Sequence, residues 1–428
     1  MDTIEITGVG SEMQGVGRLP DGRAAFVAGA LPGERVAARI VKDAGRYCEA
    51  ELVEVVEPSA HRIAPACAYS GTCGGCRIRH ADYAHTLELK RRRVTDAMAR
   101  IAGISDADVR DTVGCENPER TRNKAEYAVR DGRVGMIAAG GVGFVEIDDC
   151  LLQSEASIRA MRHAAVLLRG TGIDGWLVTR TNAAGEAMTI LSAQGAAPRW
   201  LGRLLEAEGV KSVYFCALKP RPAHALDGKM THVAGVGTIS EPLCGLRFEL
   251  SPQTFFQVNP RQAEVLYSLA LDAAALDDTC SLLDAYCGCG TITLAAARRA
   301  GRALGVEIVA PAIQDARKNA EANGLSDKAR FICADAGTEI PRLVRAGERF
   351  NRVILDPPRK GCDPALIDAL GVLKPERISY VSCDPATLAR DVKLLAAREF
   401  QLQCVTPVDM FPWTGHVECV ALMARVSK

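Results

Sequence analysis

The 428-residue sequence lacks long apolar runs and lacks an excess of charge of either sign. No stretch approaches the roughly 18 apolar residues of a membrane-spanning helix, so we expect no membrane partner. The first residues carry neither a basic segment nor an apolar core, which predicts no secretory signal and a cytoplasmic location. Its 52 lysines and arginines balance 52 aspartates and glutamates. A nucleic-acid surface would therefore have to be local.

The chain also has no low-complexity tract and no internal repeat. Its 48% hydrophobic and 24% charged residues are typical of globular proteins, and its length predicts two or three domains. Basic residues cluster locally at residues 90–93, at residues 120–124, and at Arg77 with Arg79. Such a run is more often a solvated face than a nucleic-acid contact.

Cysteine is unusually frequent, with sixteen residues. In a chain without a secretory signal, this number indicates a reducing compartment and metal-binding or catalytic roles for some thiols. Cys67, Cys73 and Cys76 lie within ten residues, and the glycines between the last two let the backbone fold around a bulky centre. We expect Cys150 to be the fourth ligand, with Cys115 as the alternative. Four thiolates suit either zinc or an iron–sulfur cluster, and sequence spacing does not separate the two.

The order of expected elements predicts a multi-domain α/β protein with three parts. Residues 1–57 have the short strands and glycine turns of a small OB-like barrel. Residues 58–250 hold the cysteine cluster, a helix at 83–103, which could pack on the third part, and mainly strands, including a hairpin at 122–137. Strands and helices alternate in residues 251–428, which predicts a Rossmann-like parallel sheet.

Several residues suited to chemistry follow the expected strands of this third part. The carboxyl ends of parallel strands meet at one edge, where open α/β sheets bind their ligands. A glycine-rich turn there admits a cofactor close to the backbone, and an acid can reach ribose hydroxyls. The residues at this edge are Tyr286, Gly288 and Thr291 around the glycine-rich turn, and Glu307, Asp335, Asp356 and Cys383 after later strands.

Two enzyme classes compete for this pattern. A nicotinamide-dependent dehydrogenase would carry Gly-x-Gly-x-x-Gly in the turn, which is absent, and hydride transfer needs no thiol. An S-adenosylmethionine-dependent methyltransferase fits better. The Asp356-Pro357-Pro358 element also occurs in amino-methyltransferases, where an aromatic residue usually follows, but here Arg359 follows.

Cys383 and Glu418 are the candidates for chemical catalysis. Cys383 lies between a strand and the helix start Asp384-Pro385, whose positive end favours thiolate. Glu418 opens an otherwise apolar strand, where partial desolvation would raise its pKa and make it a better base. A small buried thiol and a salt-bridged structural glutamate are the simpler explanations.

Five motifs together resemble the RNA 5-methyluridine methyltransferases that use S-adenosylmethionine; they lie at residues 251–259, 284–288, 356–361, 381–385 and 411–418. The resemblance implies Cys383 as nucleophile and Glu418 as base. It implies contact with the cofactor or target base for Gln257, Tyr286, Gly288, Thr291, Glu307, Asp335 and Asp356. Relatives often carry asparagine in place of Thr291, which makes that contact the least secure.

The same resemblance covers the amino-terminal half. It implies a TRAM RNA-binding module at residues 1–57 and a 4Fe-4S iron–sulfur cluster on Cys67, Cys73, Cys76 and Cys150. The branch that acts on ribosomal RNA tends to carry both, so we expect a monomeric enzyme that methylates C5 of a uridine in a loop of 23S ribosomal RNA. Transfer RNA is the alternative substrate. A catalytically silent RNA-binding protein is the alternative from another class, and the intact Cys383 and Glu418 oppose it.

Overall fold

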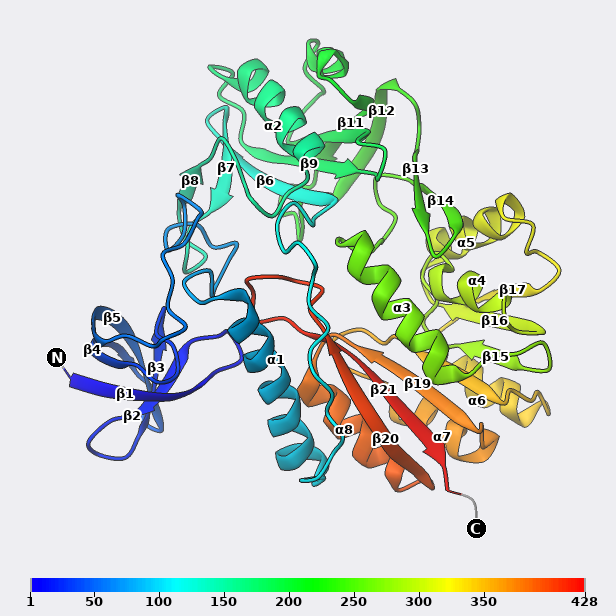
Figure 1. Cartoon of the computed structure of the whole chain (residues 1–428). Helices are drawn as coiled ribbons and strands as arrows, with labels where there is room; N and C mark the ends of the chain where they lie inside the picture. The colour runs from blue at the N-terminus through cyan, green and yellow to red at the C-terminus, as the bar shows by residue number, and fades with distance from the viewer. Residues whose placement is uncertain (1, 427–428) are drawn as a thin grey trace.

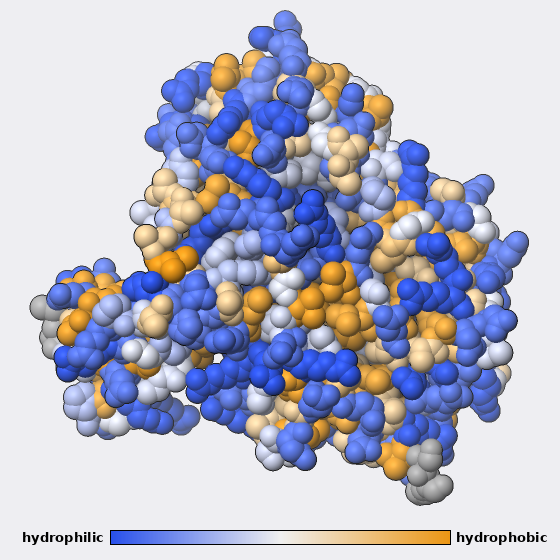
Figure 2. All heavy atoms as spheres, viewed as in Figure 1, coloured by the Kyte–Doolittle hydropathy of each residue, from blue (hydrophilic) through white to orange (hydrophobic). Residues whose placement is uncertain are grey.

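The computed structural model describes residues 2–426, which form a small barrel, a central β region and a carboxyl-terminal α/β region (Figure 1). None of the helices in this part of the chain is both long and apolar enough to cross a lipid bilayer. Apolar side chains gather near the centre of the face in Figure 2, between the central region above and the α/β region below.

The barrel closes in the strand order β1-β2-β3-β5-β4. Its strands are β1 (Asp2–Val9), β2 (Gly15–Arg18), β3 (Ala24–Ala28), β4 (Arg35–Asp43) and β5 (Tyr47–Glu57). Alternate residues such as Ile4, Ile6 and Val36 point inward and form its core. The expected barrel is confirmed, although β2 was missed because its sequence, Gly-Val-Gly-Arg, has only one strong strand former.

A helix connects the cysteine-rich segment to the α/β region. Helix α1 (Tyr83–Ala97) begins at Asp82, whose side chain accepts from the His85 backbone N–H, and continues into a π-helical turn, η1 (Met98–Ala102). Val94 of α1 and Met98 of η1 share a core with Leu388 and Val392 of the α/β region. The expected helix is confirmed, and it packs on the α/β region.

The central region is a seven-stranded sheet in the order β12-β11-β10-β9-β6-β7-β8. Its elements are β6 (Lys124–Arg130), β7 (Arg133–Ile137), β8 (Phe144–Glu146), α2 (Glu155–Leu168), β9 (Gly175–Thr181), β10 (Ala187–Ala193), the 3₁₀ helix η2 (Leu201–Glu206), β11 (Val210–Leu218) and β12 (Gly228–Gly235). A separate hairpin, β13 (Ile239–Leu243) and β14 (Leu246–Leu250), leads to the α/β region.

The expected hairpin in this region is confirmed. Asp131 and Gly132, between β6 and β7, have φ angles of 50° and 70°, as a two-residue turn of this kind requires. Helix α2 was not expected. Its buried Ala156, Ala160 and Ala164 recur every four residues, a helical period that was available in the sequence.

The α/β region is a second seven-stranded sheet, in the order β17-β16-β15-β18-β19-β21-β20. Its elements are α3 (Pro260–Ala274), β15 (Ser281–Asp284), α4 (Thr291–Ala297), β16 (Arg302–Glu307), α5 (Ala310–Ala322), β17 (Ala329–Cys333), α6 (Ala336–Arg345), β18 (Arg352–Leu355), α7 (Pro364–Leu373), β19 (Arg377–Ser382), α8 (Pro385–Ala396), β20 (Phe400–Val408) and β21 (Glu418–Arg425). Strands β15 to β19 are parallel, which confirms the Rossmann-like expectation.

The order in which the parallel strands are added to this sheet reverses at β15. Strands β16 and β17 are added on one side of β15, whereas β18 and β19 are added on its other side. Such a switch point opens a crevice at the carboxyl ends of the strands, where ligands of open α/β sheets bind. Strands β20 and β21 add an antiparallel pair beside β19.

Candidate active site and cysteine cluster

Cys383 and Glu418 face each other across two neighbouring strands. Strands β19 and β21 are antiparallel, with Ser382 opposite Cys419. Cys383, just after β19, and Glu418, the first residue of β21, are the residues next to this pair, and Glu418 is close enough to raise the pKa of the Cys383 thiol. Residues 35 positions apart in sequence are thus brought together at the carboxyl edge of the parallel strands.

The segment around Cys383 folds locally as its sequence predicts. The Asp384 carboxylate accepts hydrogen bonds from the backbone N–H groups of Ala386 (2.8 Å) and Thr387 (3.0 Å), and Pro385 is the first residue of α8. The pKa of the half-buried Cys383 thiol is nevertheless raised to about 11, chiefly by loss of solvation and then by Glu418 and Asp356. The expected preference for thiolate is therefore not met in the protein alone, because loss of solvation and the two nearby carboxyl groups outweigh the field of the helix start.

Glu418 is buried, so the expected loss of solvation is seen. Its residue is only 4% exposed, and loss of solvation, followed by the field of Asp356, raises its pKa to about 8. Burial and Asp284 raise the pKa of Asp356 to about 7. Arg359 lowers the pKa of both Cys383 and Glu418. The arginine that weakened an amino-methyltransferase assignment therefore lies where it stabilises negative charge.

The glycine-rich turn lies beside the switch point of the sheet. Its Gly288 and Gly290 have φ angles of 54° and 88°, which favour glycine. The Glu307 carboxylate accepts from the backbone N–H of Gly288 (3.2 Å) and of Val309 (2.9 Å), so it fixes the end of β16 against the turn. The Thr291 hydroxyl donates to the Tyr267 hydroxyl at 3.4 Å.

Two further acids border this turn. Asp284, which sequence reasoning did not include among the site residues, is fully buried at the end of β15 and accepts from the Thr293 hydroxyl at 2.6 Å. Its pKa is raised to about 6 by loss of solvation. Asp335 caps α6 by accepting from the Thr338 N–H, so it has a local structural role in addition to its position at the edge. The sequence feature that could have identified Asp284 as a site residue is its place at the start of the motif at residues 284–288.

The motif at residues 251–259 lies between the two sheets. The Asn123 side chain of the central region donates to the Gln257 carbonyl at 3.2 Å, and Arg180 donates to the Thr254 carbonyl. The Thr254 hydroxyl donates to Asp315 of α5 at 2.9 Å. Sequence reasoning missed Arg180, because Thr254, to which it donates, lies 74 residues away in the sequence.

Four cysteines line one cavity between the cysteine-rich loop and the central sheet. Three belong to the loop, whose Gly74 N–H donates to the Ile137 carbonyl of β7 at 2.9 Å. The cavity is lined by Cys67, Cys73, Cys76 and Cys150, together with Arg79 and Arg122 among others. Cys115 is not in this lining; its sulfur lies 3.4 Å from the Asp409 carbonyl. The fold thus brings together the four expected ligands.

The spacing of these thiols bears on the metal. Four sulfurs bound tetrahedrally at about 2.3 Å from zinc lie roughly 3.8 Å apart. Within residues 2–426, no three of the four sulfurs all lie within 4.8 Å of one another.

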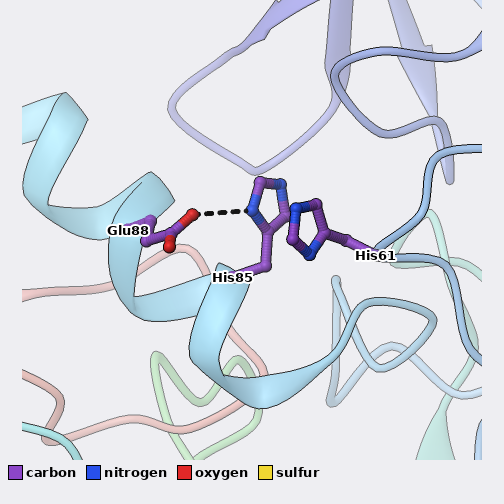
Figure 3. Close-up of side chains that lie close together, drawn as sticks. All are labelled: His61, His85 and Glu88. Carbon is purple, nitrogen blue, oxygen red and sulfur yellow. Dashed lines mark hydrogen bonds and ion pairs between the residues drawn. The ribbon is translucent and has the colours of Figure 1, made fainter.

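A second group of metal-binding residue types lies at the start of α1 (Figure 3). The His61 and His85 rings are stacked, with centroids 3.9 Å apart and planes within 2° of parallel. His85 Nδ1 contacts Glu88 at 3.0 Å, and His61 Nδ1 contacts Asp82 at 2.7 Å. A ring nitrogen binds metal in the plane of its ring, so parallel stacked rings cannot both reach one ion. We interpret the group as a packing contact.

Comparison with known proteins gives consistent matches. The family described as tRNA (Uracil-5-)-methyltransferase matches residues 244–426, and the TRAM domain matches residues 3–53. Uncharacterized RNA methyltransferases of Caldanaerobacter subterraneus and Halalkalibacterium halodurans are 38% and 36% identical to the chain; each match covers 99% of this chain, and 98% and 97% of the respective relative. The crystal structure of Pyrococcus abyssi tRNA (uracil-54, C5)-methyltransferase in complex with S-adenosyl-L-homocysteine is 24% identical, with a TM-score of 0.78 over 99% of this chain and 100% of that one.

Proposed function

Because the chain belongs to the RNA methyltransferase family that carries a tRNA (uracil-5-)-methyltransferase domain and a TRAM domain, we propose that it methylates C5 of a uridine in RNA with S-adenosylmethionine. The observation that carries this proposal is that Cys383 and Glu418 directly adjoin the paired residues Ser382 and Cys419 at the ligand-binding edge of the sheet. Methylation at C5 needs a nucleophile and a base that reach the same ring. These two residues supply that pair.

The proposed mechanism is covalent. The Cys383 thiolate adds to C6, and the ring electrons move towards C5 and the C4 carbonyl as an enolate. C5 then takes the electrophilic methyl group that S-adenosylmethionine supplies. The Glu418 carboxylate removes the remaining hydrogen from C5, the C5–C6 double bond re-forms, and Cys383 leaves as thiolate. The target base has to be turned out of the RNA for these atoms to meet.

The raised pKa values of Cys383 and Glu418 mean that both groups must be deprotonated when the substrate binds. With pKa values of about 11 and about 8, the Cys383 thiol and the Glu418 carboxyl are mostly protonated at pH 7 in the protein alone. Each has to lose its proton before its step. Arg359 favours the anionic form of both groups. We therefore assign Arg359 the stabilisation of negative charge in the proposed reaction.

The carboxyl edge fits the proposed cofactor. Glu307 is held by two backbone N–H groups beside the glycine turn, at a strand end where an acid would be able to bind ribose hydroxyls. Ile308 and Val309 follow it and are 62% and 50% exposed, so they offer an apolar surface to a planar ring. We assign the binding of S-adenosylmethionine to Gln257, Tyr286, Gly288, Thr291, Glu307, Asp335 and Asp356.

We also propose that Cys67, Cys73, Cys76 and Cys150 hold a 4Fe-4S cluster. Their shared cavity supports this assignment. Arg79 and Arg122 in the same lining would offset the negative charge of the thiolates. Because methyl transfer moves no electron to or from the protein, we assign the cluster a structural role.

For the substrate we propose 23S ribosomal RNA, recognised in a loop or single-stranded region by a monomeric protein in the cytoplasm. The combination of barrel and cysteine cluster supports this choice through the family resemblance. Transfer RNA is the second candidate, because the Pyrococcus structure named for a transfer-RNA methyltransferase matches 99% of this chain, barrel included.

The test is methyl transfer to defined RNA. Purified protein is incubated with methyl-labelled S-adenosylmethionine and with either unmodified 23S ribosomal RNA or unmodified transfer RNA, and 5-methyluridine is then mapped. We expect label at C5 of uridine in ribosomal RNA. Label in transfer RNA alone would replace the substrate, and no label in either RNA would contradict the proposed activity.

A further inference from the structure

The segment at residues 409–417, called here the base loop, joins two adjacent strands of the α/β sheet. It leaves β20 at Val408 and enters β21 at Glu418, and these two residues are paired across the strands. Asp409, the first residue of the loop, is therefore a direct neighbour of the residue opposite Glu418. Whatever holds Asp409 also determines how the chain approaches Glu418.

A buried ion pair holds this end of the base loop. The Lys90 ammonium of α1 donates to the Asp409 carboxylate and to the Phe411 carbonyl, the latter at 2.9 Å. Neither charged side chain has any exposed surface. The two partners are 319 residues apart, so the pair ties helix α1 directly to the loop.

Further hydrogen bonds converge on the same place. The Tyr83 hydroxyl of α1 donates to the Asp409 carboxylate at 2.7 Å. The Gln262 side chain donates to the Asp409 carbonyl at 3.3 Å, and the Asn259 side chain donates to the Met410 carbonyl at 3.2 Å. Asn259 caps α3 and ends the motif that contains Gln257, so the base loop is held both by α1 and by the start of α3.

Stability alone does not explain such a pair. Removing two charges from water costs about as much as their attraction returns, and apolar replacements of buried pairs are often neutral or stabilising. An ammonium with three donors does, however, fix direction, and here it fixes two points of the base loop. The network is therefore suited to hold geometry.

We propose that Lys90, Asp409 and Tyr83 are positioning residues that aim Glu418 at the hydrogen it removes from C5. The inference rests on the proposed role of Glu418 as the base. Cys383 follows β19, and in the described part of the chain none of the side-chain hydrogen bonds of Lys90 and Tyr83 is made to that strand. Loosening the network should thus slow proton removal more than the addition of the thiol or the transfer of the methyl group.

The test is the double variant Lys90→Met, Asp409→Asn, which removes both charges and keeps an acceptor for Tyr83. We expect the turnover rate to fall by about tenfold to a hundredfold, the range set by a misplacement of roughly 1 Å. The Michaelis constant for RNA should change less than about twofold. A methyl-labelled protein–RNA adduct that survives denaturation should accumulate, because the stalled step is the release of Cys383.

A second ion pair in the same domain, with a buried arginine and an exposed glutamate, provides the control. Arg352 and Glu376 lie 2.5 Å apart at the amino ends of β18 and β19, away from the site edge. The double variant Arg352→Met, Glu376→Gln should turn over normally and give no adduct. If the Lys90, Asp409 variant fails to fold, Tyr83→Phe removes one hydrogen bond and should still raise the adduct fraction.

Two results would overturn the inference: normal turnover of a folded network variant, or lost turnover without an adduct while Glu418→Gln gives one. A Glu418→Gln protein that forms no adduct would instead contradict the base itself, so the two failures can be told apart. In that case the proposed positioning role of Lys90, Asp409 and Tyr83 would be contradicted as well.

Discussion

At the scale of single residues, the property that suits Glu418 to catalysis makes the folded state less stable. Burial and the neighbouring Asp356 raise its pKa to about 8, so the folded protein resists ionisation of this group. A base with a pKa near the working pH is effective in proton transfer. The same placement disfavours the native state whenever the solvent would ionise the carboxyl.

The proposed catalytic role of Glu418 can be tested in isolation with glutamine. Glu418→Gln keeps the shape of the side chain but cannot accept the C5 hydrogen, so thiol addition and methyl transfer should proceed and release should stop. We expect a labelled, denaturation-resistant protein–RNA band on a gel. The band should be absent in Cys383→Ala, Glu418→Gln, and normal turnover of a folded Glu418→Gln protein would remove this residue from the base role.

The effect of Glu418 on stability should depend on pH. The unfolded chain releases this proton near pH 4.5 and the folded protein near pH 8, so wild-type stability falls as pH rises between these values. With about 1.4 kcal/mol per pKa unit, the loss is on the order of 4 kcal/mol at pH 8.5. We expect Glu418→Gln to unfold at a higher temperature than wild type at pH 8.5. The difference should shrink towards pH 5, and a difference independent of pH would contradict a buried neutral carboxyl.

At the scale of elements, the cysteine-rich loop is positioned by the central sheet. Its backbone is fixed to β7, and Cys150 arrives from the segment after β8. The four cysteines therefore come together only when loop and sheet have both formed. A centre bound to all four would stabilise this junction, because binding to the folded arrangement alone shifts the folding equilibrium.

Metal analysis tests this junction. Protein purified without oxygen should contain about four irons per chain. Cys150→Ser should lower the iron content and the melting temperature, because it removes one of four ligands. Cys115→Ser is the matched control and should keep its iron, since Cys115 lies outside the cavity. Stoichiometric zinc without iron would overturn the cluster.

At the scale of the whole molecule, the three regions meet at the base loop. Arg77 and Ile78 of the cysteine-rich segment donate their backbone N–H groups to the Trp413 carbonyl at 2.8 Å and 3.2 Å. Arg93 of α1 donates to the Gly415 carbonyl. The barrel approaches the same loop, because a Cβ on Gly415 would lie 2.7 Å from the Ser11 carbonyl. The barrel is thus in direct contact with the segment that leads to Glu418.

Gly415→Ala should disturb this contact. Because the added Cβ would meet backbone at 2.7 Å, either the barrel or the base loop has to move. We expect turnover on RNA to fall by about tenfold, with the affinity for S-adenosylmethionine unchanged. Gly202→Ala is the control, as its Cβ would meet only Ala234 at 3.9 Å. Full activity of Gly415→Ala would show that the contact is not needed.

The sequence by itself determined the elements and the edge at which the site lies. The helix start at Asp384-Pro385, the strand beginning at Glu418 and the acids at 307 and 356 all follow from neighbouring residues, since caps, turns and strand alternation are local properties. The hairpin at 122–137 was predictable for the same reason. The sequence of helix α2 has apolar residues at a helical spacing, so the helix could have been predicted from the sequence.

Only the tertiary structure decided which distant residues meet and what their charges become. Three features depend on partners far along the chain. They are the presence of Cys150 rather than Cys115 in the cysteine cavity, the pairing of Lys90 with Asp409, and the raised pKa of Cys383. A single sequence shows a cap or a turn because its partners are a few residues away. Burial and long-range contacts arise only when separate elements pack, and they set the solvation that controls these pKa values.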